Sequence, residues 1–387
     1  LLGLCLISYC TFAYIEVVRL SKMDVILFGA DTYNTLGALR SLRAKKINIF
    51  LILVSKKKIN YILFSKFLQT YIIVQSEQEG INYLIKNRSL KKTVILPTSD
   101  KSVSLLDKHF DILRGSYIFP TNGGQGGLTQ LMDKEKMLDY ALSVGLDVPL
   151  TIRYSKEDQL PDNLVFPCMI KPVNSMLGSK KEMSKCVNKE EVKQAIDKAK
   201  QSKEFVIQEY IEKEYDILVI GARFFSNDKV FIPAVLKKER WYGLGDDGSM
   251  GILTTDIKKY IDIKVVETLI KKTNYYGPFS IEFGVMKQKL YFYEINFRND
   301  GTSHYFNALN INIPYMWVLD AYGHHIDINQ KLSSKEHLFI DEFGDYLNIV
   351  TNRLPINKWY RDFRQATVFK YYYRGDLKPF LLIIPHM

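Results

Sequence analysis

The chain has 387 residues, of which 47% are hydrophobic and 25% charged, an ordinary globular balance that suits two or three domains. The formal net charge is +11, yet the basic residues form no nucleic-acid-binding motif and no aromatic–basic platform, which argues against a nucleic-acid partner. We interpret clusters such as Lys56–Lys58 and Lys91–Lys92 as a solvated face, with an anionic substrate or a membrane surface as the alternative. The four cysteines show neither paired metal spacing nor a disulfide framework, so we expect a reducing, cytoplasmic environment.

Residues 1–22 precede the first clear structural element. Residues 1–15 are uncharged and mostly apolar, a run shorter than the ~20 residues that a membrane span needs. They also lack the basic start and small-residue cleavage site of a signal peptide. Met23 is followed at once by Asp24 and then by the apolar run at residues 25–30. We interpret residues 1–22 as a non-native upstream segment, with a short membrane anchor as the alternative, and we expect no stable membrane insertion.

From Met23 onward, apolar runs alternate with helical patterns. Strands are predicted at residues 25–30, 47–54, 71–75 and 94–97, and helices near residues 34–44, 77–87 and 102–113. This alternation predicts a parallel sheet with helices on its faces, a Rossmann-like α/β domain over residues 23–122. The first turn, residues 29–37, does not carry the dinucleotide fingerprint, so NAD is not predicted.

The next segment contains two lysines in defined local settings. The glycine run at residues 123–127 lacks the Lys-Ser/Thr ending of a phosphate loop and is interpreted as a flexible hinge. Asp133 is a good N-cap for a helix that Gly145 ends, which places Lys134 in the first turn. The apolar run that begins at residue 166 ends in Lys171, and a lysine at the end of a buried strand must find a partner or reach water.

Residues 277–301 read as two short alternating strands joined by a turn at Met286–Lys289. In the first strand, Ser280, Glu282 and Gly284 share one side, and Ile281, Phe283 and Val285 share the other. In the second strand, Glu294, Asn296 and Arg298 share one side, and Tyr293, Ile295 and Phe297 share the other. If the hairpin is centred on Gln288, Glu282 faces Glu294, whereas a four-residue turn would put the two glutamates on opposite faces. Two carboxylates, an amide oxygen and a guanidinium on one face suit a hard cation that also carries phosphates, although a plain solvated sheet face has the same pattern.

The Glu-x-Asn-x-Arg motif at residues 294–298, preceded twelve residues earlier by Glu282, resembles the magnesium site of the ATP-grasp superfamily, to which biotin carboxylase, carbamoyl phosphate synthetase and D-alanine–D-alanine ligase belong. Three upstream segments match the family in the same order, so the resemblance covers most of residues 23–325. It implies a two-lobed α+β ATP-grasp domain over residues 123–325, behind a Rossmann-like domain that helps to hold the acceptor substrate. Residues 326–387 form a C-terminal extension without recognisable chemistry, and we expect it to pack on the ATP-grasp domain.

The resemblance also assigns ATP-binding roles at matching positions. Lys134 and Lys171 would contact phosphates, and Ser175 lies in the mobile flap over the phosphates. Glu209 and the backbone to Ile211 would meet the adenine amino edge, and Glu214 would accept from the ribose hydroxyls. The flap departs from the Gly-rich form and is similar to the Ser-containing flap of the D-alanine ligase group.

The same resemblance places the metal and the catalytic residues. Glu282, Glu294 and Asn296 would hold Mg²⁺, with two ions expected and Mn²⁺ left open as a substitute. Arg298 would stabilise the transferring phosphoryl group, and Lys237, at the end of a strand near residues 231–240, would be the further basic residue that faces phosphate.

The implied reaction joins a small-molecule carboxylate and an amine through an acyl phosphate, with release of ADP and phosphate. Catalysis of this kind is positioning and electrostatics, so no nucleophilic side chain is expected. A phosphotransferase on the same fold and a non-catalytic ATP-binding module are the alternatives, and the complete set of Glu, Glu, Asn and Arg argues against the second. The substrates cannot be read from the sequence, and a homodimer is left open.

Overall fold

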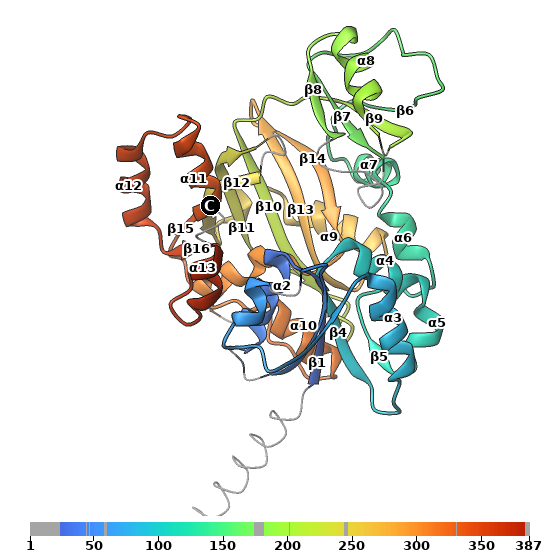
Figure 1. Cartoon of the computed structure of the whole chain (residues 1–387), viewed down its shortest axis with the longest axis vertical. Helices are drawn as coiled ribbons and strands as arrows, with labels where there is room; N and C mark the ends of the chain where they lie inside the picture. The colour runs from blue at the N-terminus through green and yellow to red at the C-terminus, as the bar shows by residue number, and fades with distance from the viewer. Residues whose placement is uncertain are drawn as a thin grey trace, which may run out of the picture.

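The computed structural model describes residues 24–43, 45, 47–57, 60–173, 182–200, 202–243, 247–329 and 331–383. Within these residues, sheets of five, seven and four strands build the molecule. Figure 1 shows the five-stranded sheet at the bottom, the seven-stranded sheet above it and the four-stranded sheet at the top right.

The five-stranded sheet is parallel throughout, as predicted, in the order β3-β2-β1-β4-β5. Its strands are β1 (Asp24–Ala30), β2 (Asn48–Val54), β3 (Thr70–Val74), β4 (Thr93–Pro97) and β5 (Tyr117–Ile118). One face packs against α2 (Tyr33–Arg43), and the other against α3 (Glu77–Lys86), α4 (Asp100–Lys108) and α5 (Phe110–Leu113). Because helices cover both faces, β1 and β2 are almost continuously apolar rather than alternating.

Side-chain caps set where the helices of this domain begin. Ser76 accepts from the N–H of Glu79 at the start of α3, and Ser99 accepts from the N–H of Ser102 at the start of α4. The single helix predicted near residues 102–113 is instead two helices, because His109 leaves the helical conformation between them. The turns after β1 and β4 lie at the carboxyl edge of the sheet, where parallel sheets commonly bind ligands.

The seven-stranded sheet has the order β14-β13-β10-β11-β12-β15-β16. Its strands are β10 (Tyr215–Arg223), β11 (Val230–Tyr242), β12 (Asp247–Thr254), β13 (Gly277–Met286), β14 (Lys289–Asn296), β15 (His337–Ile340) and β16 (Val368–Phe369). Helix α9 (Ile263–Lys272) covers one face, while α2, α10 (Ile313–Ala321) and the 3₁₀ segment η4 (Gly301–Leu309) cover the other. Gly37 and Gly301 let α2 and η4 touch, because a Cβ on Gly37 would lie 2.5 Å from the carbonyl oxygen of Gly301.

A continuous apolar core therefore joins the parallel sheet to the seven-stranded sheet. Trp317 of α10 is fully buried within this core, alongside residues of β1, β2, β10 and β11. The boundaries at residues 122/123 and 325/326 remain a prediction, because the packing is continuous across them.

The four-stranded sheet has the order β6-β9-β7-β8 and is antiparallel. It contains β6 (Thr151–Ser155), β7 (Cys168–Pro172), β8 (Ser184–Cys186) and β9 (Glu204–Glu209), with α8 (Lys189–Lys198) packed on one side. Helices α6 (Gly127–Leu131) and α7 (Lys134–Leu142) lead into it from the parallel domain. Asp107 contacts the end of the glycine run and the start of α6: its main-chain oxygen accepts from the N–H of Gly126, and its carboxylate accepts from the N–H groups of Leu128 and Thr129.

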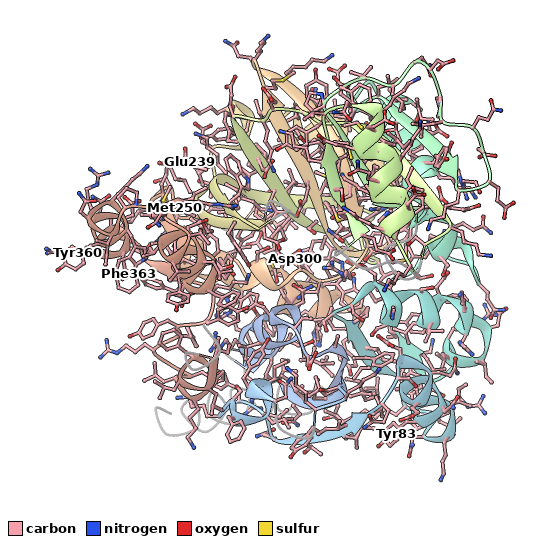
Figure 2. All side chains as sticks on the ribbon, turned by 45° about the horizontal axis from the view of Figure 1, so that its top comes forward. Tyr83, Glu239, Met250, Asp300, Tyr360 and Phe363 are labelled. Carbon is pink, nitrogen blue, oxygen red and sulfur yellow. The ribbon has the colours of Figure 1, made fainter. Side chains whose placement is uncertain are left out.

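The C-terminal extension contacts both preceding parts. Strand β15 extends the seven-stranded sheet beside β12, and α11 (Glu342–Val350), α12 (Ile356–Gln365) and α13 (Lys378–Ile383) follow. A fully buried ion pair of 3.1 Å joins Asp376 to Arg40 of α2. Helix α12 lies at the outer edge of the molecule, with Tyr360 and Phe363 on it (Figure 2). Throughout the described ranges, no helix is long and apolar enough to cross a bilayer.

Candidate active site

A cavity of about 500 Å³ lies between the four-stranded and seven-stranded sheets and reaches the carboxyl edge of the parallel sheet. The cavity brings together eight residues singled out from the sequence: Lys134, Lys171, Glu209, Ile211, Glu282, Glu294, Asn296 and Arg298. Its remaining lining includes Asn34 and Asp100 from the parallel domain. All three sheets therefore contribute to one site.

The β13–β14 hairpin has the predicted pairing at its functional end, where Glu282 lies opposite Glu294. The turn that joins the two strands differs from the one that we expected, which was centred on Gln288. Lys287 and Gln288 form a two-residue turn with φ of 50° and 64°, which on its own would put Glu294 on the opposite face. A bulge at Tyr293 shifts the register by one residue and restores the Glu282–Glu294 pair.

Because of the bulge, the Tyr293 side chain lies on the opposite face of the hairpin from the one that we predicted. We expected this residue on the apolar face, but it lines the cavity beside Glu294, and the fully buried Phe292 takes the place in the core. Gly284 leaves the space that the Tyr293 ring needs, because a Cβ there would lie 2.1 Å from the Tyr293 hydroxyl.

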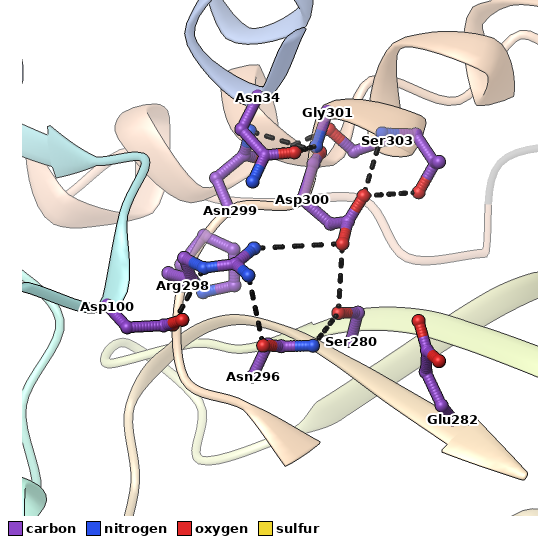
Figure 3. Close-up of polar contacts among 12 residues, drawn as sticks. Asn34, Asp100, Ser280, Glu282, Asn296, Arg298, Asn299, Asp300, Gly301 and Ser303 are labelled. Carbon is purple, nitrogen blue, oxygen red and sulfur yellow. Dashed lines mark hydrogen bonds and ion pairs between the residues drawn. The ribbon is translucent and has the colours of Figure 1, made fainter. Parts of the chain in front are cut away.

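Hydrogen bonds link the polar side chains at the end of the hairpin (Figure 3). The Asn296 amide donates to Ser280 Oγ over 3.3 Å, and Ser280 Oγ donates to Asp300 Oδ2 over 3.2 Å. Arg298 Nη2 donates to Asn296 Oδ1 over 3.0 Å. These contacts fix the direction of the amide, so that its oxygen points toward the guanidinium.

Arg298 is held by a carboxylate that the sequence analysis did not single out. Its Nε donates to Asp100 Oδ1 over 2.8 Å, and its Nη1 lies 3.7 Å from Asp300 Oδ2. Burial by itself would lower the pKa of Arg298, but the carboxylates of Asp100 and Asp300 outweigh burial and raise it. In turn Arg298 lowers the pKa of Asp300, against the effect of burial. The guanidinium is thus fixed in place at the junction of two sheets.

A lysine of β11 reaches the paired carboxylates, and it is Lys238 rather than Lys237. Lys238 is 9% exposed, and its Nζ donates to Glu282 Oε1 over 3.2 Å. Burial alone would lower the pKa of Lys238, but Glu282 and Asp216 raise it above its usual value. Neighbouring residues of a strand point to opposite faces, so Lys237 points away from Glu282 and pairs with Glu239.

Two lysines, Lys134 and Lys171, line the cavity on the side of the four-stranded sheet. Lys171 Nζ donates to Gln208 Oε1 over 2.9 Å and lies 6.0 Å from the centre of the Tyr293 ring. Burial, followed by repulsion from Lys134, lowers the pKa of Lys171 to about 8. Lys134 lies in the first turn of α7, which Asp133 caps, and its amine has no hydrogen-bond or ion-pair partner among the described residues. Both cations are therefore poised for an anionic ligand.

Part of the cavity lining is apolar and includes the segment after β9, and we call this part the apolar slot. Its walls are formed by Met132, Met137, Leu138, Met169, Met183, Val206 and Ile211. Glu209 lines the slot, but its carboxylate already accepts from the N–H of Leu150 over 3.1 Å. Glu214 lies outside the lining and accepts from the N–H of Lys287 at the hairpin turn, whereas Lys213 lines the cavity. Ser175 lies outside the described residues.

A family model for the ATP-grasp domain matches residues 144–310. The chain contains an ATP-grasp domain.

Several solved structures resemble the whole arrangement of this ATP-grasp domain and its flanking parts. N5-carboxyaminoimidazole synthetase from Staphylococcus aureus is 16% identical, with a TM-score of 0.64 and coverage of 86% of each chain. Biotin carboxylase from Campylobacter jejuni, in complex with a nucleotide, is 15% identical over 82% of this chain and 75% of its own, with a TM-score of 0.62. L-amino acid ligase from Bacillus licheniformis is 13% identical over 78% and 74%, with a TM-score of 0.60. No curated protein matches the chain by sequence. At these identities the likeness establishes the fold.

The oxygen donors of the ATP-grasp domain fit a magnesium ion that is shared with a nucleotide. No group of three or more His, Cys, Asp or Glu side chains that could hold a metal occurs in the part of the chain that the structure describes. Glu282 and Glu294 nevertheless lie directly opposite one another, and Glu294 has no hydrogen-bond partner among the described residues. Because Mg²⁺ is usually bound by one or two carboxylates together with substrate phosphates, rather than by an all-protein cage, this donor set fits.

Proposed function

We propose that the protein is an ATP- and Mg²⁺-dependent ligase that joins a small-molecule carboxylate to an amine. One observation carries this proposal: a single cavity combines an apolar slot, the two lysines and the opposed glutamates, which lie beside the guanidinium of Arg298. The names of the similar structures, which include a ligase, a synthetase and a carboxylase, support the same class of reaction.

ATP is oriented by the two ends of the cavity. The adenine ring enters the methionine-lined slot, where Glu209 and the main chain to Ile211 meet its amino edge. The phosphates extend toward Lys134 and Lys171, whose positive charges offset theirs. Ser175, in the flap, would add a hydroxyl donor. Since Glu214 accepts from the N–H of Lys287 and Lys237 pairs with Glu239, both away from the carboxylate pair, we assign neither of them a role.

At the other end, Glu282, Glu294 and Asn296 supply the metal ligands, and two ions are expected, with Mn²⁺ able to use the same oxygen donors. When bound, Mg²⁺ neutralises charge on the β- and γ-phosphates. Lys238 holds the carboxylate of Glu282 in position for this task. The carboxylate oxygen of the substrate attacks the γ-phosphorus, the bond to ADP breaks, and an acyl phosphate forms.

Arg298 is placed to stabilise the acyl phosphate and the charge that develops during transfer. The amine nitrogen then attacks the carbonyl carbon, phosphate leaves, and the nitrogen loses a proton to give the amide. Asn34 and Asp100 line the cavity next to Arg298, so the acceptor substrates meet the parallel domain here. Their contribution explains why the site needs both parts of the chain.

The test of this function uses Mg-ATP, pools of small carboxylates and hydroxylamine as the trapping amine. A ligase releases ADP and phosphate and yields a hydroxamate from the matching carboxylate, and Glu294→Gln abolishes both signals. A stable phosphorylated product without a need for amine would assign the chain to the phosphotransferases. ATP binding without turnover in every pool would instead leave a binding module.

A further inference from the structure

Helix α12 carries an apolar stripe that the fold leaves partly uncovered. Ile356, Trp359, Tyr360 and Phe363 recur at the spacing that places side chains on one side of a helix. No residue of α12 is buried, and Ile356 and Tyr360 are 68% and 57% exposed. The helix lies at the outer edge of the molecule, where Tyr360 and Phe363 project (Figure 2).

The attachment of α12 explains why its apolar side faces outward. Asp362 accepts from Arg240 Nη1 over 2.8 Å, which ties the polar side of the helix to β11. Tyr360 is two positions away, and residues two apart point to nearly opposite sides of a helix. An ordinary surface helix buries its apolar stripe. In α12 the contact with β11 is made by Asp362 instead, which leaves Ile356 and Tyr360 exposed.

The exposed apolar surface continues from α12 to α13. Ring centres are 5.2 Å apart between Phe363 and Phe369, 5.6 Å between Phe369 and Tyr372, and 5.6 Å between Tyr372 and Phe380. We call the exposed members of this surface the C-terminal aromatic face: Ile356, Tyr360, Phe363, Tyr372, Leu377, Leu381 and Leu382.

The exposed charged side chains of the segment that carries this face have one sign. Between residues 351 and 383, six basic side chains are exposed: Arg353, Lys358, Arg361, Arg364, Arg374 and Lys378. The two acidic residues of the segment, Asp362 and Asp376, are engaged by Arg240 and Arg40. An approaching surface therefore meets aromatic and aliphatic side chains together with exposed basic side chains of the same segment.

We propose that the C-terminal aromatic face binds the surface of anionic membranes, with α12 lying in the interface and not crossing the bilayer. Short helices with Trp, Tyr and Phe on one side and Lys or Arg beside them partition into this zone. A second copy of the chain is a poorer occupant, because a symmetric contact would press the same basic residues against one another. Figure 1 shows α12 at the opposite side of the molecule from the four-stranded sheet, so docking would leave the ATP cavity open.

The test is flotation of the full chain with vesicles of neutral phosphatidylcholine, alone or mixed with about 30% of an anionic phospholipid. We expect binding to the anionic vesicles only, and weaker binding as salt is raised. Ile356→Ser with Tyr360→Ser should lower the partition coefficient at least about tenfold. Arg364→Glu with Lys378→Glu should lower it at least about twentyfold, since each basic residue near the surface is worth about fivefold.

The matched control is Lys108→Glu with Lys258→Glu, which changes the net charge equally at exposed sites elsewhere. This control should retain at least half of the binding. The proposal is overturned if the control loses as much binding as the Arg364/Lys378 variant, or if neutral vesicles bind equally well. It is also overturned if the lipid-free protein is a dimer that the Ile356/Tyr360 variant converts to a monomer, since a second copy would then occupy the face. Circular dichroism of each variant confirms that it is folded.

Discussion

Exchanging each of the two opposed glutamates for glutamine separates metal binding from folding. The carboxylate of Glu294 is exposed and has no hydrogen-bond partner among the described residues. It also lies directly opposite Glu282. Glu294→Gln therefore removes the repulsion from Glu282, and it also removes the attraction of this carboxylate to Lys171 and Arg298. Because these changes oppose one another and no hydrogen-bond donor loses its acceptor, the ligand-free variant should stay within about 0.5 kcal/mol of the wild type.

Glu282→Gln should behave differently before any ligand is added. Lys238 is nearly buried and donates to Glu282 over 3.2 Å, so the substitution takes away its charged acceptor. A hydrogen bond to a charged group is worth about 1.5–3 kcal/mol, and the nearby Asp216 and Asp300 soften the loss. We expect the free energy of unfolding to fall by about 1–2 kcal/mol.

Both variants should lose most of the stabilisation by Mg-ATP. At a ligand concentration of about 100 times the Kd, binding adds about 2.7 kcal/mol, and a hundredfold weaker Kd would leave about 0.4 kcal/mol. Urea unfolding with and without Mg-ATP measures all of these quantities. Equal ligand-free stabilities of the two variants would refute the Lys238 argument, and an undiminished Mg-ATP effect in Glu294→Gln would place the metal elsewhere.

Three further results are expected. Because the pKa of Lys171 is lowered to about 8, its amine loses its charge as pH rises through that value, so ATP affinity measured by calorimetry should weaken above about pH 8 and become pH-independent in Lys171→Arg. Asp100→Asn should lower kcat at least about tenfold with little change in ATP affinity, because only the orientation of Arg298 is lost, and an unchanged kcat would contradict that role. Asp376→Asn should cost about 3–5 kcal/mol in urea unfolding because Arg40 stays buried without its partner, and a loss below about 1 kcal/mol would show that the pair is dispensable.

The sequence alone determined the features that depend on short-range patterns. Alternation with a period of two was enough to place Glu294 and Asn296 on one side of a strand, and a cap residue was enough to place Lys134 in the first turn of a helix. The parallel sheet was predictable for the same reason, since buried strands read as short apolar runs between helical patterns.

Tertiary structure decided what each of these side chains meets. The Tyr293 bulge depends on strand pairing, so its effect on the hairpin faces could not be read from either strand. Lys238 rather than Lys237 reaches Glu282, because that choice depends on how β11 is placed across β10. Asp100 contacts Arg298 across 198 positions of sequence, and only the packing of the parallel domain against the ATP-grasp domain brings them together. Local patterns fix the direction of a side chain, but its partner is set by chain packing at long range.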